Sequence, residues 1–395
     1  MQKYYPYLIM LSHMINDSCQ SVLPALLPLF IYTYGLSLEQ AGFLILANTA
    51  LSSLLQPLLG YISDKLNQPR LIAAGTLLSA CSTGMMGFVS SYESLLVCAT
   101  LAGVGSSIFH PEGAKIMNRL GGGKKGKAMG TFAIGGSSGF AFGPLFAGAI
   151  AYTVGAHGLA AFTVAGIIIS TVLFLLMPRI VAHAQTIDQA VATENPTVAV
   201  QPLKNYWKYF GILFIIILSQ SVNFRVINAF IPVFWTHELG TSPEQGSFAL
   251  TVFFSIGIFM TYIGGLLGDK YGPIKIIRLS LLIWLPSMFL LTQVPEFSVT
   301  IMMPLAYLIL LMIGAAKAIS YSPVIVLGQT YLAKSIGFAS GITLGVSQTI
   351  GGIIAPVVGN LADTYSLPVA MMTLVPFLIV GLGASLLLKD PKKLQ

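Results

Sequence analysis

The chain has 395 residues, of which 55% are hydrophobic and only 8% charged, and its mean hydropathy is +0.83. A soluble domain carries about 25% charged residues, so this composition excludes a water-soluble globular protein and indicates a membrane protein. The formal net charge of +7 does not indicate a nucleic-acid partner, because the basic residues lie in short loops, where they orient helices and contact anionic lipid.

Twelve apolar runs follow one another along the chain, each about 20 residues or longer, which is the length that spans a bilayer core. We expect them near residues 6–34, 41–63, 71–90, 94–117, 127–152, 158–178, 206–236, 244–268, 274–293, 297–326, 338–362 and 367–388. The sequence therefore predicts an all-α membrane protein with twelve transmembrane helices. A six-helix bundle over 1–178 and a second over 206–395 are joined by a polar linker over 179–205.

The distribution of basic residues predicts the topology. With a cytoplasmic N-terminus, all but two of the 20 lysines and arginines fall in cytoplasmic segments, and the outer loops contain none. This is the pattern of the positive-inside rule. We therefore expect both termini and the linker in the cytoplasm, in a protein of the cell membrane. The two exceptions, Arg225 and Lys317, fall inside apolar runs.

The two halves also repeat short patterns. The segments GYISDKLNQPR and GLLGDKYGPIK follow equivalent helices, and His13-x-x-Asn16 corresponds in position to Arg225-x-x-Asn228. Two similar halves predict a substrate site between them near the membrane midplane. The paired G-x-x-x-D-K loops resemble the signature loop of the major facilitator superfamily, although one such loop alone is also typical of an ordinary charged turn. The resemblance implies a conformational role for the residues Gly60, Asp64, Lys65, Arg70, Gly265, Asp269 and Lys270.

The fifth apolar run contains small residues at regular spacing. Gly130, Gly139, Gly143 and Pro144 resemble the antiporter motif of the same superfamily, in which small residues permit tight packing and the proline bends the helix. The alternative is a general small-residue interface between helices. The resemblance favours export in exchange for protons.

The first apolar run carries polar residues on one face. His13, Asn16, Asp17 and Gln20 follow the i, i+3, i+4, i+7 spacing. An ionisable group inside the membrane costs about 2.5–3.5 kcal/mol or more, so it must face a partner or a cavity. Burial favours the protonated form of a carboxylate, which makes Asp17 the candidate proton carrier. The alternative is a structural hydrogen-bond cluster.

The fourth run ends in His110-Pro111-Glu112, and the proline interrupts the helical hydrogen bonding. His110 and Glu112 together are candidates for a proton relay, or Glu112 pairs with Lys115 or Arg119 near the inner surface. Many antiporters of the superfamily have an arginine at the position of Ala99. Its absence here means that coupling must use other residues.

The second half supplies two intramembrane bases, each with polar neighbours: Asn223 and Asn228 near Arg225, and Tyr321 one turn after Lys317. These bases either neutralise Asp17 and Glu112 or bind an anionic substrate, since arginine suits bidentate contact with a phosphonate or carboxylate. Both interpretations stay open at this point.

Over residues 10–150 the segments SHMINDSCQSVLPALLP, LLQPLLGYISDK and GVGSSIFHPEGAK resemble the fosmidomycin-resistance branch of the superfamily. The resemblance implies a major facilitator fold and a monomeric, proton-coupled antiporter that exports a small drug-like or anionic compound, with roles for His13, Asp17, His110 and Glu112. The alternative is a proton symporter or facilitator that takes up an organic anion. The G-x-x-x-x-G-K match at 121–127 is followed by Ala128 rather than the serine or threonine of a P-loop, so it does not indicate an ATPase. We expect no enzymatic activity and no cofactor, because His110 and Glu112, the only candidate catalytic pair, have neither a nucleophile nor metal-ligand spacing beside them.

Overall fold

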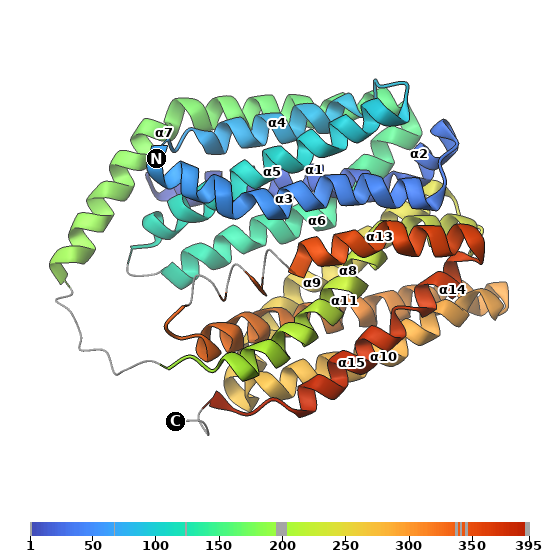
Figure 1. The fold of residues 1–395 in the computed structure, drawn as a ribbon. Coiled ribbons are helices and arrows are strands. Elements are labelled where there is room, and N and C mark those ends of the chain that lie inside the picture. Colours follow the sequence, from blue (N-terminus) through green and yellow to red (C-terminus); the bar gives the residue numbers. More distant parts are fainter. Residues whose placement is uncertain are drawn as a thin grey trace. The chain divides into compact units, whose positions relative to one another are not determined.

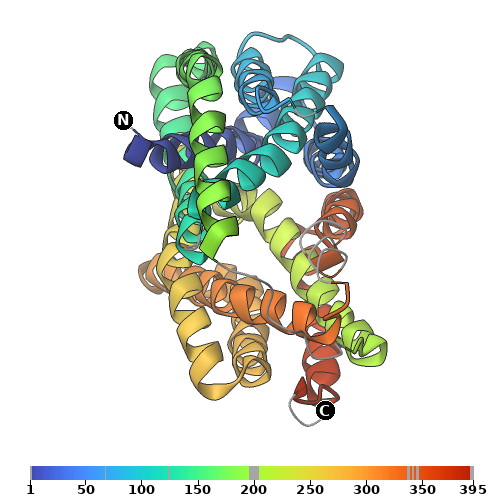
Figure 2. The same ribbon diagram turned by 90° about the vertical axis from the view of Figure 1, so that its left-hand side faces the viewer.

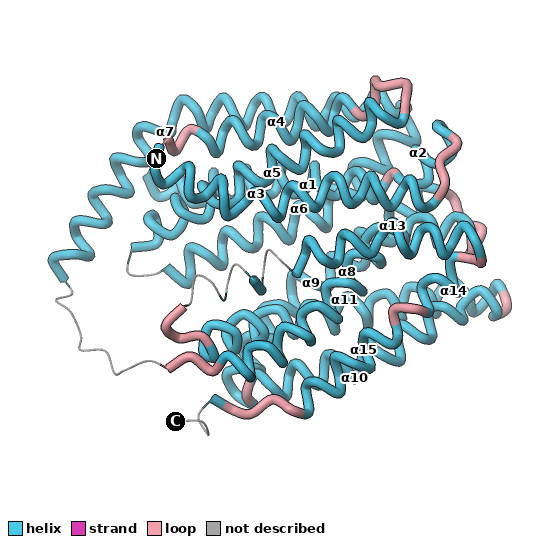
Figure 3. Tube along the Cα trace, in the orientation of Figure 1, coloured by secondary structure: helices cyan, strands magenta, loops and turns pink. Residues whose placement is uncertain are grey.

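The structure, a computed structural model, describes residues 2–66, 68–122, 125–194, 204–335, 339, 342–343 and 347–391. Within these residues it consists of helices joined by short loops (Figure 3). One isolated β-bridge joins Asn205 and Leu332. The helices are α1 (Tyr5–Ala25), α2 (Leu27–Tyr34), α3 (Leu38–Leu66), α4 (Leu71–Met85), α5 (Tyr92–Gly121), α6 (Lys125–Val154), α7 (Ala160–Glu194), α8 (Trp207–His237), α9 (Pro243–Tyr271), α10 (Pro273–Gln293), α11 (Val299–Tyr331), α13 (Ser347–Thr364), α14 (Leu367–Met372) and α15 (Val375–Leu386) (Figure 1).

The helices account for the apolar runs of the sequence. In the described part of the chain, eight helices are long and apolar enough to cross a membrane, or nine when the bent pair α1 and α2 counts as one span. The helices α3, α4 and α13 occupy the positions of the other three predicted spans. The order of elements is therefore consistent with twelve spans, and the all-α membrane architecture is confirmed.

The helix α7 is longer than its apolar run. It continues to Glu194, through the first half of the polar stretch that we predicted as a linker, and in Figure 2 its green C-terminal part lies in front of the N-terminal helices. Alanine and glutamine in this stretch are good helix formers, so polar composition alone does not end the helix. An ion pair between Arg119 Nε and Asp188 Oδ2, 2.9 Å apart, attaches this extension to α5.

The helices form two compact units. Unit 1 comprises Met1–Leu23 and Ala47–Gln201, and unit 2 comprises Pro24–Leu46 and Pro202–Gln395. The chain passes from unit 1 to unit 2 at Pro24, close to the 48° bend between α1 and α2. Pro24 lies within α1 and Pro28 at the start of α2, and a proline that removes a helical hydrogen bond is the usual cause of such a bend.

Within unit 2, the start of α3 is attached to the end of α13. The Asp363 carboxylate accepts hydrogen bonds from the backbone N–H groups of Leu38 and Glu39, at 2.8 and 2.9 Å. The Asn360 amide donates to Glu39 at 2.9 Å. Gly359 allows this approach, because a Cβ atom there would lie 2.8 Å from the nitrogen of Glu39. Asp363 therefore satisfies the free N–H groups of another helix, as an N-cap residue does within its own.

We expect Asp363→Ala to loosen the start of α3. Loss of a cap exposes its N–H groups to exchange, so deuterium uptake at Leu38 and Glu39 should accelerate about five-fold. Hydrogen exchange followed by mass spectrometry on the reconstituted protein measures this. Glu93→Ala, at an exposed position in the first turn of α5, is the control and should leave those two amides unchanged. Equal exchange in wild type and Asp363→Ala would show that the carboxylate does not hold α3.

Candidate functional site

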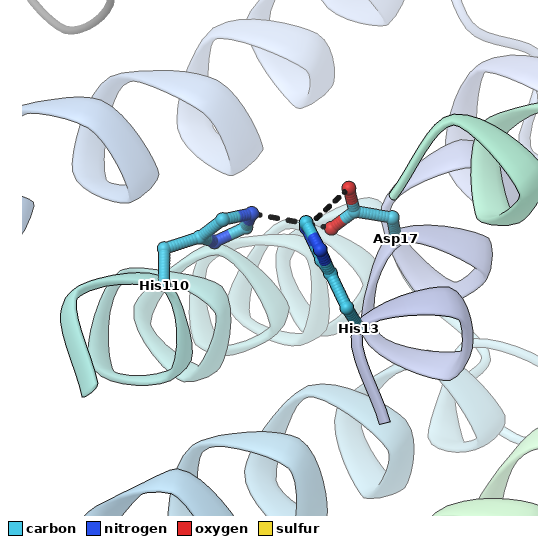
Figure 4. Close-up of side chains that lie close together, drawn as sticks. All are labelled: His13, Asp17 and His110. Carbon is cyan, nitrogen blue, oxygen red and sulfur yellow. Dashed lines mark ion pairs between the residues drawn. The ribbon is translucent and has the colours of Figure 1, made fainter. Parts of the chain in front are cut away.

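Three titratable side chains of unit 1 converge between α1 and α5. Asp17 Oδ2 lies 3.2 Å from His13 Nε2, and Asp17 Oδ1 lies 3.3 Å from His110 Nε2 (Figure 4). The side chains of His13 and Asp17 are only 7% and 5% exposed, whereas that of His110 is 27% exposed. Asp17 thus bridges two histidines in an almost fully buried site that is open on the side of His110.

Local helix geometry and backbone groups position this cluster. His13 and Asp17 are one turn apart on α1, so their side chains lie on the same face. Asn16 donates to Asp17 Oδ1 at 3.0 Å and to Ser106 Oγ at 3.2 Å, which connects α1 to α5. The His13 ring stacks on Phe132 of α6 with ring centroids 3.9 Å apart. Each member is therefore held by at least one neighbouring helix.

The remaining ring nitrogens of the histidines contact backbone carbonyl oxygens. His13 Nδ1 lies 2.7 Å from the oxygen of Phe132, and His110 Nδ1 lies 2.9 Å from the oxygen of Ser106. A carbonyl oxygen can only accept a hydrogen bond, so both Nδ1 atoms donate, and both Nε2 atoms face Asp17. The three side chains present ligand atoms within 4.8 Å of one another, a spacing that a metal ion could bridge. Hydrogen bonds in the two N···O contacts would hold the same arrangement without a metal.

The glycines of α6 make room for the cluster. A Cβ atom on Gly136 would lie 2.7 Å from both Asp17 Oδ2 and His13 Nε2, and one on Gly139 would lie 2.9 Å from Asp17 Cβ. A Cβ atom on Gly143 would lie 2.8 Å from the Cα of Ser18. A Cβ atom on Gly130 would meet no described atom within 4 Å. The predicted motif therefore packs on α1 through Gly139 and Gly143, and Gly136 adds the closest contact with the cluster.

We expect Gly136→Ala to disrupt the cluster. Its methyl group would collide with Asp17 and His13, and overpacking of this kind costs about 1–3 kcal/mol, so both the melting temperature and transport should fall. Gly130→Ala is the matched control on the same helix, and it should melt at the same or a higher temperature because alanine favours a helix. Thermal denaturation of both purified variants measures this. Equal melting temperatures would contradict the packing described for Gly136.

Two residues that the sequence grouped with this site lie in other contacts. Gln20 donates to the backbone oxygen of Ala102 at 3.0 Å and to Ser79 Oγ at 3.3 Å, so it connects α1 to α4 and α5. Glu112 is buried, and Lys115 Nζ lies 4.0 Å from its Oε1. This is the alternative pairing that the sequence left open for Glu112.

The two intramembrane bases lie near each other in unit 2, around one aromatic ring. Lys317 Nζ of α11 is 4.4 Å from the centre of the Phe224 ring, and the Arg225 guanidinium of α8 is 5.7 Å from it. Lys317 is also 5.2 Å from the centre of the Tyr321 ring. Lys317 and Tyr321 line a pocket together with Phe224 and the polar side chain of Gln220.

The two asparagines predicted near Arg225 are both buried. Asn223 donates to the backbone oxygens of Ser219 and Leu374, at 3.0 and 3.2 Å, which connects α8 to the segment before α15. Asn228 Oδ1 has no hydrogen-bond partner among the described residues. Asn223 Oδ1 also has no hydrogen-bond partner among the described residues, so Asn223 has a structural contact through its NH2 group and both asparagines keep an acceptor available.

The signature loops are described only in part. The side chains of Gly60, Asp64 and Lys65 lie outside the described side chains. Arg70 stacks on the Phe174 ring at 4.7 Å. In the second copy, Asp269 and Lys270 are exposed at the end of α9. The closest approach of α9 to α11 in this copy is at Gly264, where a Cβ atom would lie 2.8 Å from the Cα of Ile319. A Cβ atom on Gly265 would lie 3.4 Å from its nearest neighbour, Ser322 Oγ.

Sequence reasoning missed four residues that build these sites: Ser106, Phe132, Gly136 and Phe224. Ser106 is one turn before His110, which was the available signal for it. Phe132 acts through its backbone oxygen and its ring face, and neither leaves a pattern in a sequence. Gly136 was hidden among the many glycines of its helix.

A bundle of long apolar helices with buried charged groups is the architecture of a multi-pass membrane transporter. The sequence model of the Major Facilitator Superfamily matches residues 9–356 and 212–395. The chain belongs to this superfamily, whose members are transporters of small molecules.

Individual relatives agree with this. The chain is 30% identical over 393 residues to the MFS-type transporter YfnC of Bacillus subtilis, covering 98% of this chain and 94% of that protein. It is also 30% identical over 366 residues to the Fosmidomycin resistance protein of Escherichia coli, covering 91% of this chain and 86% of that protein. The resemblance to the fosmidomycin-resistance branch is thus confirmed.

Solved structures share the fold at lower sequence identity. A bacterial homolog of the human lysosomal transporter Spinster matches with a TM-score of 0.76 at 17% identity, covering 98% of this chain and 96% of that one. A D-xylose-proton symporter matches with a TM-score of 0.74 at 15% identity, with the same coverage of both chains. These similarities confirm the major facilitator fold.

Proposed function

We propose that this transporter is a proton-coupled antiporter that exports a small organic anion by alternating access. The observation that carries the proposal is the pair of cations around Phe224. Among the described residues of unit 2, neither Arg225 nor Lys317 forms an ion pair with a carboxylate. Two unneutralised cations within a membrane protein are costly, and an anionic substrate would compensate both.

The chemistry of the two bases suits a phosphonate or carboxylate. Arg225 offers a planar guanidinium for bidentate contact, and its Nε has no hydrogen-bond partner among the described residues. Lys317 adds a point charge at the wall of a pocket that also contains Gln220 and Ser320. Phe224 and Tyr321 supply apolar surface for the rest of a drug-like molecule.

The His13–Asp17–His110 cluster is the proposed proton-coupling element. Its carboxylate is paired with two histidines of unit 1, whereas the bases belong to unit 2, so in this proposal proton coupling and substrate binding use separate groups. Gain or loss of a proton changes the contacts between α1 and α5 directly. Glu112, two residues after His110, is a second candidate for the relay.

Two findings favour export. The first is the resemblance of the α6 glycines to the antiporter motif. The second is that the Escherichia coli relative is a Fosmidomycin resistance protein. Fosmidomycin is a phosphonate anion, and resistance by a transporter implies outward movement of the drug. The alternative is uptake by proton symport, for which the same pair of bases would serve.

We propose the plasma membrane as the location, with both termini in the cytoplasm and a monomer as the transporting unit.

Transport in inverted membrane vesicles tests this function. A gradient with the vesicle interior acidic should drive accumulation of a labelled phosphonate, and its collapse with an ionophore should release it. Accumulation driven by an alkaline interior would indicate symport instead. The drug resistance of a strain that expresses the protein, measured with phosphonates, lipophilic cations and neutral drugs, identifies the class of substrate. Resistance confined to lipophilic cations would overturn the anion proposal.

A further inference from the structure

The hydrogen bonds around the His13–Asp17–His110 cluster determine how many protons it holds. Both Nδ1 atoms donate to backbone carbonyl oxygens, of Phe132 and Ser106. Each Nδ1 must therefore carry a hydrogen whether its imidazole is neutral or charged, because a carbonyl oxygen cannot donate one. When either histidine is neutral, its Nε2 therefore carries a lone pair and no hydrogen. That lone pair points at a carboxylate oxygen, which is also an acceptor when ionised.

Each of the two N···O contacts consequently needs one proton of its own. The proton is either on Nε2, as an imidazolium beside a carboxylate, or on the Asp17 oxygen, as a neutral acid beside a neutral imidazole. The contacts of 3.2 and 3.3 Å use different carboxylate oxygens, so one proton cannot serve both. We infer that the cluster, in the arrangement seen here, holds two exchangeable protons, one in each contact, and that both are the coupling protons of one transport cycle. The second half of this inference rests on the proposed function.

The surroundings of the cluster supply no further titratable partner among the described contacts of these three side chains. On α6 the facing groups are the Phe132 carbonyl and Gly136, and on α1 and α5 they are the amide of Asn16 and the hydroxyl of Ser106. Glu112 lies beside Lys115. Cys19, on α1 two residues after Asp17, is a buried free cysteine. The two-proton form thus carries one net positive charge, and its loss of both protons leaves one negative charge.

The two protons differ in access. His110 is 27% exposed, whereas His13 is 7% exposed and enclosed by Phe132. We expect the proton between His110 and Asp17 to leave first. Its loss leaves two lone pairs facing each other, which opens this contact between α5 and α1. Departure of the second proton then releases His13 from Asp17 within α1.

The coupling ratio tests the inference directly. In proteoliposomes with the membrane potential clamped at zero, the anion gradient that stops net flux of a labelled phosphonate is measured at several imposed pH gradients. Two protons per cycle predict a hundred-fold change in the anion ratio per pH unit, because each coupled proton contributes ten-fold. His110→Gln should reduce this to ten-fold, whereas His157→Gln, at an exposed position, should keep it at a hundred-fold. A ten-fold slope in the wild type overturns the inference and leaves the proposed function intact, whereas no dependence on the pH gradient overturns the proposed function.

A second measurement needs neither transport nor a functional variant. Nitrogen-15 spectra of histidine-labelled wild-type protein, recorded through a pH titration, report which ring nitrogen carries hydrogen. We expect Nδ1 of His13 and His110 to stay protonated throughout, with Nε2 alone exchanging its proton. A neutral form of either residue with hydrogen on Nε2 and none on Nδ1 would overturn the two-proton count, whatever the transport result.

Discussion

Asp17→Asn should abolish transport driven by a pH gradient while leaving the protein able to bind its anion. The side chain keeps its size, but an amide cannot take up or release a proton, and neither histidine retains a charged partner. Driven uptake into inverted vesicles should fall to the background of vesicles without the protein, a loss of at least about 100-fold if coupling depends on this one group. Exchange of labelled for unlabelled phosphonate at equal pH, which needs no net proton movement, should continue.

The contrast between driven transport and exchange identifies a coupling residue. A variant that is merely misfolded loses both activities, so retained exchange shows that Asp17→Asn is folded. Glu93→Gln, on the exposed first turn of α5, is the control for removal of a carboxylate and should keep both. Intact proton-driven transport in Asp17→Asn would show that Asp17 is not the carrier, and Glu112→Gln would then be the variant to examine.

Arg225→Gln and Lys317→Gln should each weaken binding of the anion strongly. A hydrogen bond to a charged group contributes about 1.5–3 kcal/mol, which corresponds to roughly a 10- to 100-fold rise in the dissociation constant. Lys317→Arg, which keeps the charge, should bind better than Lys317→Gln. Equilibrium binding of a labelled phosphonate to the purified variants measures both effects.

Two further comparisons make the test of the bases specific. Lys208→Gln removes an exposed positive charge from the start of α8, the helix that carries Arg225, and should leave binding unchanged. Neutral drugs that bind through Phe224 and Tyr321 should lose little affinity in Arg225→Gln. Unchanged phosphonate affinity in both glutamine variants would show that the bases serve the structure of unit 2 and do not contact substrate.

The candidate site illustrates where sequence reasoning succeeds and where it stops. Helical spacing was sufficient to place His13 and Asp17 on one face of α1, because the period of a helix is fixed by its backbone geometry. The pairing of Asp17 with His110 depends on how α5 packs against α1, and that packing depends on Gly136 and Phe132 of a third helix. From the sequence alone, Asp17 was as plausible a partner for Arg225 or Lys317. The contacts of unit 1 now favour the histidines.

The sequence by itself determined that this protein is an all-helical membrane transporter with two similar halves, because bilayer thickness dictates the length of each apolar run and loop charges follow the membrane's asymmetry. It also showed which charged residues lie inside the apolar runs. Only the tertiary structure decided that α2 and the start of α3 group with the C-terminal helices, and that both histidines donate through Nδ1. These features depend on contacts between residues far apart in the chain, which no local pattern encodes. The proton-coupling cluster that we propose therefore depends on the packing of α1, α5 and α6, which brings both histidines to Asp17.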